Sequence, residues 1–202
     1  MPSTKSNIIT LDTSQPIWEH FFTVAPLVVI GTKEGKNYDL APKHMATPLG
    51  LDNFFGFVCT PRHSTYHNVK KEGYFTVSFP KPNQVVMASF AASPRCGEEG
   101  NEKTTLQNLP TFPAPHMDAL FVQKGYLYLE CEHFKTVDGF GEHSLICGKI
   151  TGAYIDEQYL RLSEKDEQEM VYHSPLVAYL PHGRFAEIKE TWAFPFPKDF
   201  KN

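Results

Sequence analysis

The chain has 202 residues, of which 41% are hydrophobic and 21% charged, and its formal net charge at pH 7 is -4. This length and composition suit one ordinary globular domain with a substantial core. A chain with net negative charge lacks the basic face of most nucleic-acid-binding proteins, so we expect no nucleic-acid partner. No apolar run approaches the length of a membrane span and no signal-peptide pattern is present, so we expect a cytoplasmic protein without membrane contact.

The four cysteines show none of the close spacing that disulfide frameworks or zinc sites require. Cys59, Cys131 and Cys147 lie in apolar, strand-like runs, where a thiol behaves as a small hydrophobic group. Cys96 lies in a loop between Arg95 and Gly97 and is the one expected to be exposed. The sequence therefore predicts reduced thiols, most of them buried.

The N-terminal half of the chain predicts a tail followed by strands. A short helix is expected over Ile17–Thr23, because Pro16 is well placed for its first turn. The apolar run Leu27–Thr32 predicts a strand, and the turn Glu34–Asn37 folds the next segment, Tyr38–Ala41, back on it. The elements expected next are a strand over Phe54–Thr60, a helix over Tyr66–Lys71 that ends at Gly73, and a strand over Tyr74–Phe79.

The C-terminal half is also rich in predicted strands. Its expected elements are a helix over Pro82–Ala92, a loop-rich stretch over Ala92–Pro115, strands over Leu120–Val137 (interrupted near Gly125) and Ser144–Ile155, a helical turn over Asp166–Tyr172, and a hairpin of Leu176–Leu180 and Arg184–Ile188. Six to eight strands, few short helices and no helix–strand alternation predict a mostly β protein, an antiparallel β-barrel. We expect one domain over residues 24–190, between a tail with the short helix (1–23) and an aromatic tail (191–202) that its prolines keep from being helical.

Chemistry-bearing residues gather where the strand Phe54–Cys59 runs into the next helix. Arg62, Ser64 and Thr65 stand just before or at the start of that helix. Free N–H groups and the helix dipole favour an anion there, and a guanidinium can grip phosphate with two hydrogen bonds. The segment therefore predicts a phosphate site, although hydroxyls that merely cap the helix would explain Ser64 and Thr65 equally well.

Several common sites are absent from the sequence. The run Gly139–Gly141 lacks the third glycine of a dinucleotide fingerprint, and neither a phosphate loop nor a Gly-x-Ser-x-Gly elbow occurs. His63 and His67 are four residues apart and could share a metal on a helix, but no obvious third ligand accompanies them. We therefore expect no metal site.

Five motifs follow one another along the chain: the strand Pro26–Thr32, the run Asp39–Pro42 with Met45–Pro48, the segment Thr60–Asn68, the run Glu72–Pro80, and Gly141–Ile150. In this order they resemble the flavin-reductase-like proteins of the FMN-binding split-barrel superfamily, over about Val24 to Ile188. The resemblance implies a split β-barrel, a homodimer with flavin near the subunit interface, and FMN as prosthetic group or exchangeable substrate.

The resemblance also implies roles for single residues. The strand end along the isoalloxazine edge corresponds to Met45, Ala46 and Thr47, although core packing is an equally good reading of Met45. The phosphate segment corresponds to Arg62, Ser64 and Thr65, and Asn68 to a position that lines the same pocket. The histidine near the docked nicotinamide corresponds to His143, with Glu142 and Ser144 in place of the usual Asp and Thr; a hydrogen-bonded turn histidine is the alternative. The chemistry of the side chains alone suggests two more ligand-binding residues, His63 at the phosphate and Thr60 beside the ring.

The leading functional hypothesis is an FMN-dependent oxidoreductase that passes hydride from NADH or NADPH to the flavin. A flavin-binding electron carrier or FMN store without nicotinamide activity is the alternative. A heme- or pyridoxal-phosphate-binding relative on the same barrel also stays open, because the predicted anion site would suit a pyridoxal phosphate too. In the reductase, His143 is the candidate catalytic residue, and we expect it to position the nicotinamide rather than to transfer a proton.

Overall fold

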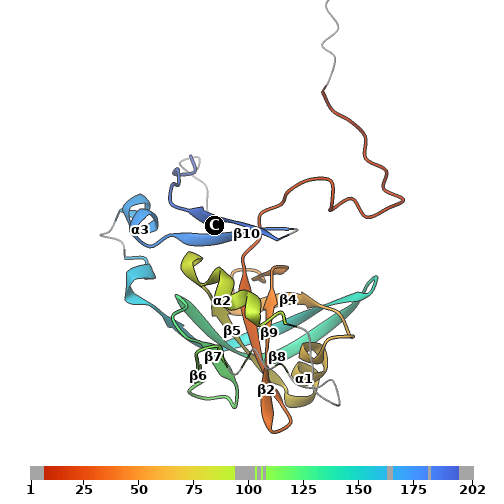
Figure 1. Ribbon diagram of the computed structural model, residues 1–202, viewed down its shortest axis with the longest axis vertical. Coiled ribbons are helices and arrows are strands. Elements are labelled where there is room, and N and C mark those ends of the chain that lie inside the picture. The colour runs from red at the N-terminus through yellow and green to blue at the C-terminus, as the bar shows by residue number, and fades with distance from the viewer. Residues whose placement is uncertain are drawn as a thin grey trace, which may run out of the picture.

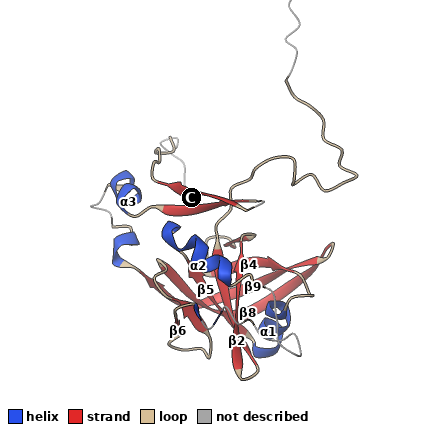
Figure 2. Cartoon of the chain, in the orientation of Figure 1, coloured by secondary structure: helices blue, strands red, loops and turns tan. Residues whose placement is uncertain are grey.

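The computed structural model describes residues 7–93, 103, 106, 108–162, 166–181 and 183–195. Its centre is a seven-stranded antiparallel sheet in the order β2-β1-β5-β8-β9-β4-β3 (Figure 2). The strands are β1 (Val28–Glu34), β2 (Asn37–Lys43), β3 (Ala46–Pro48), β4 (Phe54–Cys59), β5 (Tyr74–Phe79), β8 (Leu127–Phe140) and β9 (His143–Ile155). The prediction of a mostly β fold with an antiparallel split barrel is confirmed.

The sheet is curled because its two edge strands are neighbours in the sequence. Only His44 and Met45 separate the end of β2 from the start of β3, although these strands lie at opposite edges. The backbone N–H of Val58 in β4 donates to the carbonyl of Met45 at 2.8 Å, which fixes the link against the sheet. The two edges therefore meet at one end and stay unpaired along the rest of their length, which makes the barrel split.

Apolar side chains fill both sides of the sheet. Inside the barrel, Phe55, Phe57 and Phe75 are almost completely buried, and the rings of Phe57 and Phe75 meet edge to face at 5.2 Å. On the outside, Val29 and Leu40 belong to a second buried cluster, which the helix α2 (Val85–Phe90) covers. Because β1 is buried on both faces, its sequence is continuously apolar instead of alternating.

The helix α1 (Ser64–Glu72) lies between β4 and β5, as the sequence predicted. His63 is its N-cap residue, its first turn holds no acidic side chain, and Lys70 and Lys71 lie in its last turn. Gly73 ends the helix with a φ of 79°, a left-handed conformation that glycine adopts without strain. The charge distribution leaves the N-terminal end of α1 open to an anion.

Two hairpins and short helices complete the described chain. The hairpin β6 (Thr111–Pro113) with β7 (Leu120–Val122) lies beside the sheet, and β10 (Leu176–Leu180) with β11 (Arg184–Ile188) forms a separate two-stranded sheet near α2 (Figure 1). Ala25 and Tyr179 exchange two backbone hydrogen bonds, at 3.0 and 2.8 Å, and so tie the second hairpin to the segment before β1. The remaining helices are the short 3₁₀ turns η1 (Pro82–Gln84) and η3 (Glu157–Tyr159) and the helix α3 (Glu167–His173).

Two expectations about the elements were wrong. The predicted helix Ile17–Thr23 is only a turn, in which the N–H of His20 donates to the carbonyl of Ile17. This segment runs away from the barrel (Figure 1), and Trp18 and Phe22 stay exposed, so no packing supports a helix too short to be stable alone. Eleven strands are described instead of six to eight, since β3 and β6 have three residues each and are too short to show alternation.

The cysteine prediction is confirmed where it can be compared. Cys59, Cys131 and Cys147 are free and buried, and burial raises the pKa of each thiol. Cys96 and its loop lie outside the described residues. Among the helices that the structure describes, none is long and apolar enough to cross a membrane.

A buried carboxylate fixes the loop between β6 and β7 to the outside of the barrel. Glu130 of β8 is 1% exposed and accepts hydrogen bonds from the His116 backbone N–H at 2.7 Å and the Tyr154 hydroxyl at 2.8 Å. The Nδ1 atom of His116 lies 3.0 Å from the same carboxylate. Gly152 leaves room for the Glu130 carboxylate, because a Cβ atom at position 152 would lie 2.3 Å from a Glu130 oxygen. Burial raises the pKa of Glu130, but the hydrogen bonds from His116 and Tyr154 outweigh it, so the pKa is lowered.

We expect Glu130→Gln to lower the free energy of unfolding by about 1–3 kcal/mol, because buried donors lose a charged acceptor. A lowered pKa in the folded state means that the contribution of Glu130 is complete above the unfolded-state pKa and is lost as the pH falls through the folded-state pKa. Urea denaturation between about pH 3 and 7 should therefore show a steeper acid loss for the wild type than for the variant. The exposed Glu132→Gln on the same strand is the control, and equal curves for both variants would contradict the role of Glu130.

Candidate functional site

Five segments converge at the end of the barrel where the two sheet edges meet. Ser144 of β9 lies opposite Cys59 at the end of β4. Val58, the residue before Cys59, donates its backbone N–H to the carbonyl of Met45 in the link before β3. The end of β2 reaches the start of α1, since Lys43 Nζ lies 3.4 Å from His63 Nδ1. The predicted anion segment, the strand end near Met45 and the turn of His143 are therefore brought together.

The turn before α1 presents a guanidinium and a hydroxyl. The N–H of His63 donates to the carbonyl of Thr60 at 3.0 Å, and the N–H of Arg62 donates to the Thr60 hydroxyl at 3.4 Å. These bonds form the tight turn that leads from β4 into the helix. Arg62 is exposed and Ser64 is half-buried in the first helical turn, where backbone N–H groups have no intrahelical acceptor. This donor set suits a phosphate group.

His63 adds a neutral donor or acceptor to this turn. Burial lowers the pKa of His63, and the positive charges of Lys43 and Lys103 lower it further. Its imidazole is therefore neutral at neutral pH, so Nδ1 can accept a hydrogen bond from the Lys43 ammonium. The ammonium, and not the imidazole, supplies positive charge here.

The Thr65 side chain has a structural role. It is 1% exposed, and its hydroxyl donates to Asp39 at 3.2 Å. The same buried carboxylate lies 2.6 Å from the ammonium of Lys103, which also donates to the carbonyls of Leu40 and Ala91. Only the backbone N–H of Thr65 is therefore left to serve an anion. Sequence reasoning missed the Asp39–Lys103 pair, because 64 positions separate its members and no motif connects them.

The other predicted ligand-binding residues differ in whether their side chains face the solvent or the protein interior. Asn68 turns toward the sheet, where its amide donates to the Thr32 hydroxyl at 3.1 Å. Ala46 is buried in the barrel core, so only its backbone can border a ligand. Met45 and Thr47 are exposed on either side of it. At the predicted strand end, Met45 and Thr47 are therefore the residues whose side chains can contact a ligand.

The turn of His143 is attached both to α1 and to the turn that precedes it. Arg62 forms an ion pair with Glu142, directly before His143. Asp138 accepts a hydrogen bond from Ser144 at 2.6 Å and from the Tyr66 hydroxyl of α1 at 3.2 Å. The hydrogen bond from Ser144, and then that from Tyr66, lower the pKa of Asp138. His143 itself is exposed beside Glu142. Asp138 went unnoticed in the sequence, where it is one acid among many.

Metal binding was also considered for this end of the barrel. His63 lies outside α1 as its N-cap residue, so it and His67 do not share one helical face. Within the residues that the structure describes, no group of three His, Cys, Asp or Glu side chains gathers as metal ligands.

The chain was also compared with known protein families. A family model for the flavin reductase like domain matches residues 22–177, which include every segment described above. The chain belongs to the flavin-reductase-like family. The resemblance seen in the five sequence motifs is thereby confirmed, and flavin-related oxidoreductases are the family's class of protein. A search of curated proteins gives no match.

Solved structures of low sequence identity share the fold. An FMN-binding protein from Thermus thermophilus, with bound 1-cyclohex-2-enone, is 19% identical with a TM-score of 0.74, over 92% of this chain and 99% of that one. A flavoredoxin from Methanosarcina acetivorans is 18% identical with a TM-score of 0.73, over 96% and 97%. The 2-nitrobenzoate 2-nitroreductase of Pseudomonas fluorescens is 16% identical with a TM-score of 0.75, over 95% of each chain.

Proposed function

We propose that this member of the family binds FMN and oxidises NADH or NADPH with it. The observation that carries the proposal is the junction of the anion-binding turn at α1 with the exposed strand end at Met45 and the turn of His143. A flat cofactor with one phosphate requires an anion-binding group for the phosphate and an exposed surface for the ring, and this junction offers both. Family membership favours a flavin over the pyridoxal phosphate and heme readings.

Arg62, Ser64 and the first backbone N–H groups of α1 would hold the FMN phosphate. Arg62 is paired with Glu142, but both side chains are exposed, so the guanidinium can exchange that carboxylate for a phosphate at small cost. Met45, Thr47 and Thr60 would border the ring. Bound FMN would supply the redox chemistry by accepting electrons from the nicotinamide. The chain itself binds, orients and shields the two ligands.

His143 would orient the nicotinamide. It lies at the start of β9, beside Glu142 and within the turn that Asp138 holds against α1. This position is adjacent to the phosphate segment but on a different strand, so the two ligands would be held by separate groups. No proton transfer is needed for the electron transfer itself, and His143 is therefore a positioning residue.

A second candidate function is electron carriage by a bound flavin without nicotinamide activity. It is favoured by the similarity of the fold to a flavoredoxin. The two functions use the same FMN site and differ only at His143. We prefer the reductase, because the Tyr66–Asp138–Ser144 contacts hold the turn of His143 in a fixed position beside the anion site. The cytoplasmic location expected from the sequence accompanies this proposal as a prediction.

We further propose a homodimer. Large apolar side chains are more than half exposed on β8 and in the segments directly before and after β3. They are Met45, Leu51, Phe134 and Phe140. Phe194 of the C-terminal tail is also exposed, whereas Phe196 lies outside the described residues. Light scattering at micromolar concentration should give twice the chain mass of 22.9 kDa. A particle of one chain mass would refute the dimer.

We expect Arg62→Ala to weaken FMN binding by about 1.5–3 kcal/mol, the scale of a hydrogen bond to a charged group. Glu142→Gln removes the competing carboxylate and should leave FMN binding equal or stronger. Isothermal titration with FMN and with riboflavin, which lacks the phosphate, measures both effects. The Arg62 variant should lose affinity for FMN alone. Equal wild-type affinities for FMN and riboflavin would remove the phosphate site from α1.

We expect His143→Ala to lower kcat/KM for the nicotinamide at least about tenfold, which corresponds to about 1.4 kcal/mol of transition-state positioning. FMN affinity should stay within about twofold, because the phosphate site lies on another segment. Stopped-flow reduction of the bound flavin by NADH and by NADPH measures the first quantity, and titration measures the second. Unchanged reduction rates would exclude His143 from the nicotinamide site. Wild-type flavin that neither nicotinamide reduces would favour the electron carrier.

A further inference from the structure

A small cavity lies on the other side of Lys43 from the start of α1. Its volume is about 290 Å³, and it is lined by the end of β2, the helix α2 and the β10–β11 hairpin. Figure 1 shows α2 and the hairpin one above the other next to the curled sheet. Lys43 lines this cavity and also lies 3.4 Å from His63, so the cavity borders the anion site directly.

The walls of the cavity suit a flat apolar group. Leu27 and Ala88 are buried at its base. The rings of His44 and Tyr179 face each other at 4.8 Å with an interplanar angle of 35°, and Phe185 closes another side. A volume of this size accommodates one aromatic ring with a substituent, at the small end of ligand pockets.

The charge of the cavity is one-sided. Lys43 and Arg184 both line it, His44 adds a titratable ring, and none of the described lining residues is acidic. Among the ion pairs formed by described residues, none involves Lys43 or Arg184. Two cations that share a partly apolar cavity favour an anion between them, and a guanidinium can bind a carboxylate with two hydrogen bonds.

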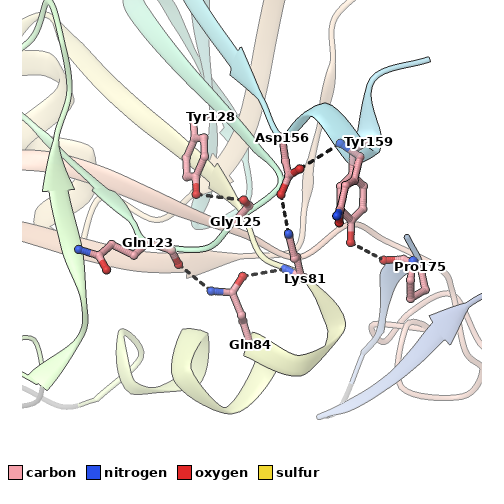
Figure 3. Close-up of polar contacts among 9 residues, drawn as sticks. Lys81, Gln84, Gln123, Gly125, Tyr128, Asp156, Tyr159 and Pro175 are labelled. Atoms are coloured by element: carbon pink, nitrogen blue, oxygen red, sulfur yellow. Dashed lines mark hydrogen bonds and ion pairs between the residues drawn. The ribbon is translucent and has the colours of Figure 1, made fainter. Parts of the chain in front are cut away.

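Polar contacts hold the walls in place before any ligand arrives. Lys81, which precedes η1 and α2, forms an ion pair with Asp156 (Figure 3). The two charged atoms lie 2.6 Å apart. Gln84 donates to the carbonyl of Gln123 at 2.6 Å, and the Tyr159 hydroxyl donates to the carbonyl of Pro175, directly before β10, at 3.3 Å. Both α2 and the hairpin are therefore fixed to the same end of β8 and β9. A cavity whose walls are already ordered binds a ligand at a low entropic cost.

We propose that this cavity binds an aromatic carboxylate, with its ring against the His44–Tyr179 pair and Phe185 and its carboxylate between Lys43 and Arg184. The site is formed by this chain alone and does not include Arg62, Ser64 or His143. That the cavity lies beside a bound flavin rests on the proposed function. That the cavity binds a carboxylate is independent of the proposed function.

The test uses the full chain, with and without saturating FMN, and benzoate as the probe. Titration of 4-fluorobenzoate followed by fluorine NMR should show saturable binding, and unlabelled benzoate should compete. Benzamide, which is flat but neutral, should compete at least about tenfold more weakly. Arg184→Gln should weaken binding at least about tenfold and leave FMN affinity unchanged, because Arg184 lies outside the FMN site. Arg161→Gln, at an exposed arginine paired with Glu167, is the matched control and should bind as the wild type does.

Three results would overturn the proposal: no saturable binding, equal binding of benzoate and benzamide, or an Arg184 variant that binds as the wild type does. The two proposals fail separately. Binding of benzoate by a chain that does not bind FMN supports the cavity and refutes the proposed function. Binding of FMN by a chain that does not bind benzoate refutes the cavity proposal and leaves the proposed function supported. Since Arg184 is exposed at the start of β11, its substitution is compatible with folding, and thermal unfolding of the variant verifies this.

Discussion

The two-residue link between β2 and β3 is the constraint on which the rest of this structure depends. Because Lys43 ends one edge strand and Ala46 begins the other, the sheet cannot stay open and flat. The curled sheet encloses the Phe55, Phe57 and Phe75 core. It also gathers the ends of β2, β3 and β4 at one place, so chemistry from segments far apart in the sequence meets there.

The charge at the start of α1 depends on which groups pair with the carboxylates nearby. Asp39 is buried with Lys103 and Thr65, and Asp138 accepts hydrogen bonds from Ser144 and Tyr66, so both carboxylates are engaged in holding loops. Glu142 is the exposed acid that meets Arg62. The start of α1 consequently faces outward with N–H groups, a guanidinium and the nearby Lys43 ammonium. An anion can approach it and need displace only one exposed carboxylate.

The sequence predicted the fold well because its strongest signals are local. Continuous apolar runs indicated β1 and β4, and Gly73 indicated the end of α1. The roles of single side chains were less predictable. Whether Thr65 faces a ligand or Asp39, and whether Asn68 faces a pocket or Thr32, depends on how α1 is rotated against the sheet. That rotation is fixed by contacts between distant segments, such as the loop that carries Lys103, and no sequence period records it.

The hairpin β10–β11 lies at the C-terminal limit of the region that the family model matches. The matched region ends at residue 177, inside β10, whereas Tyr179, Arg184 and Phe185 follow it. The barrel and the start of α1 lie wholly within the matched residues. Substitutions in the hairpin can therefore alter one wall of the neighbouring cavity while the barrel core keeps its packing. The selectivity of the cavity and the integrity of the barrel core therefore depend on different side chains.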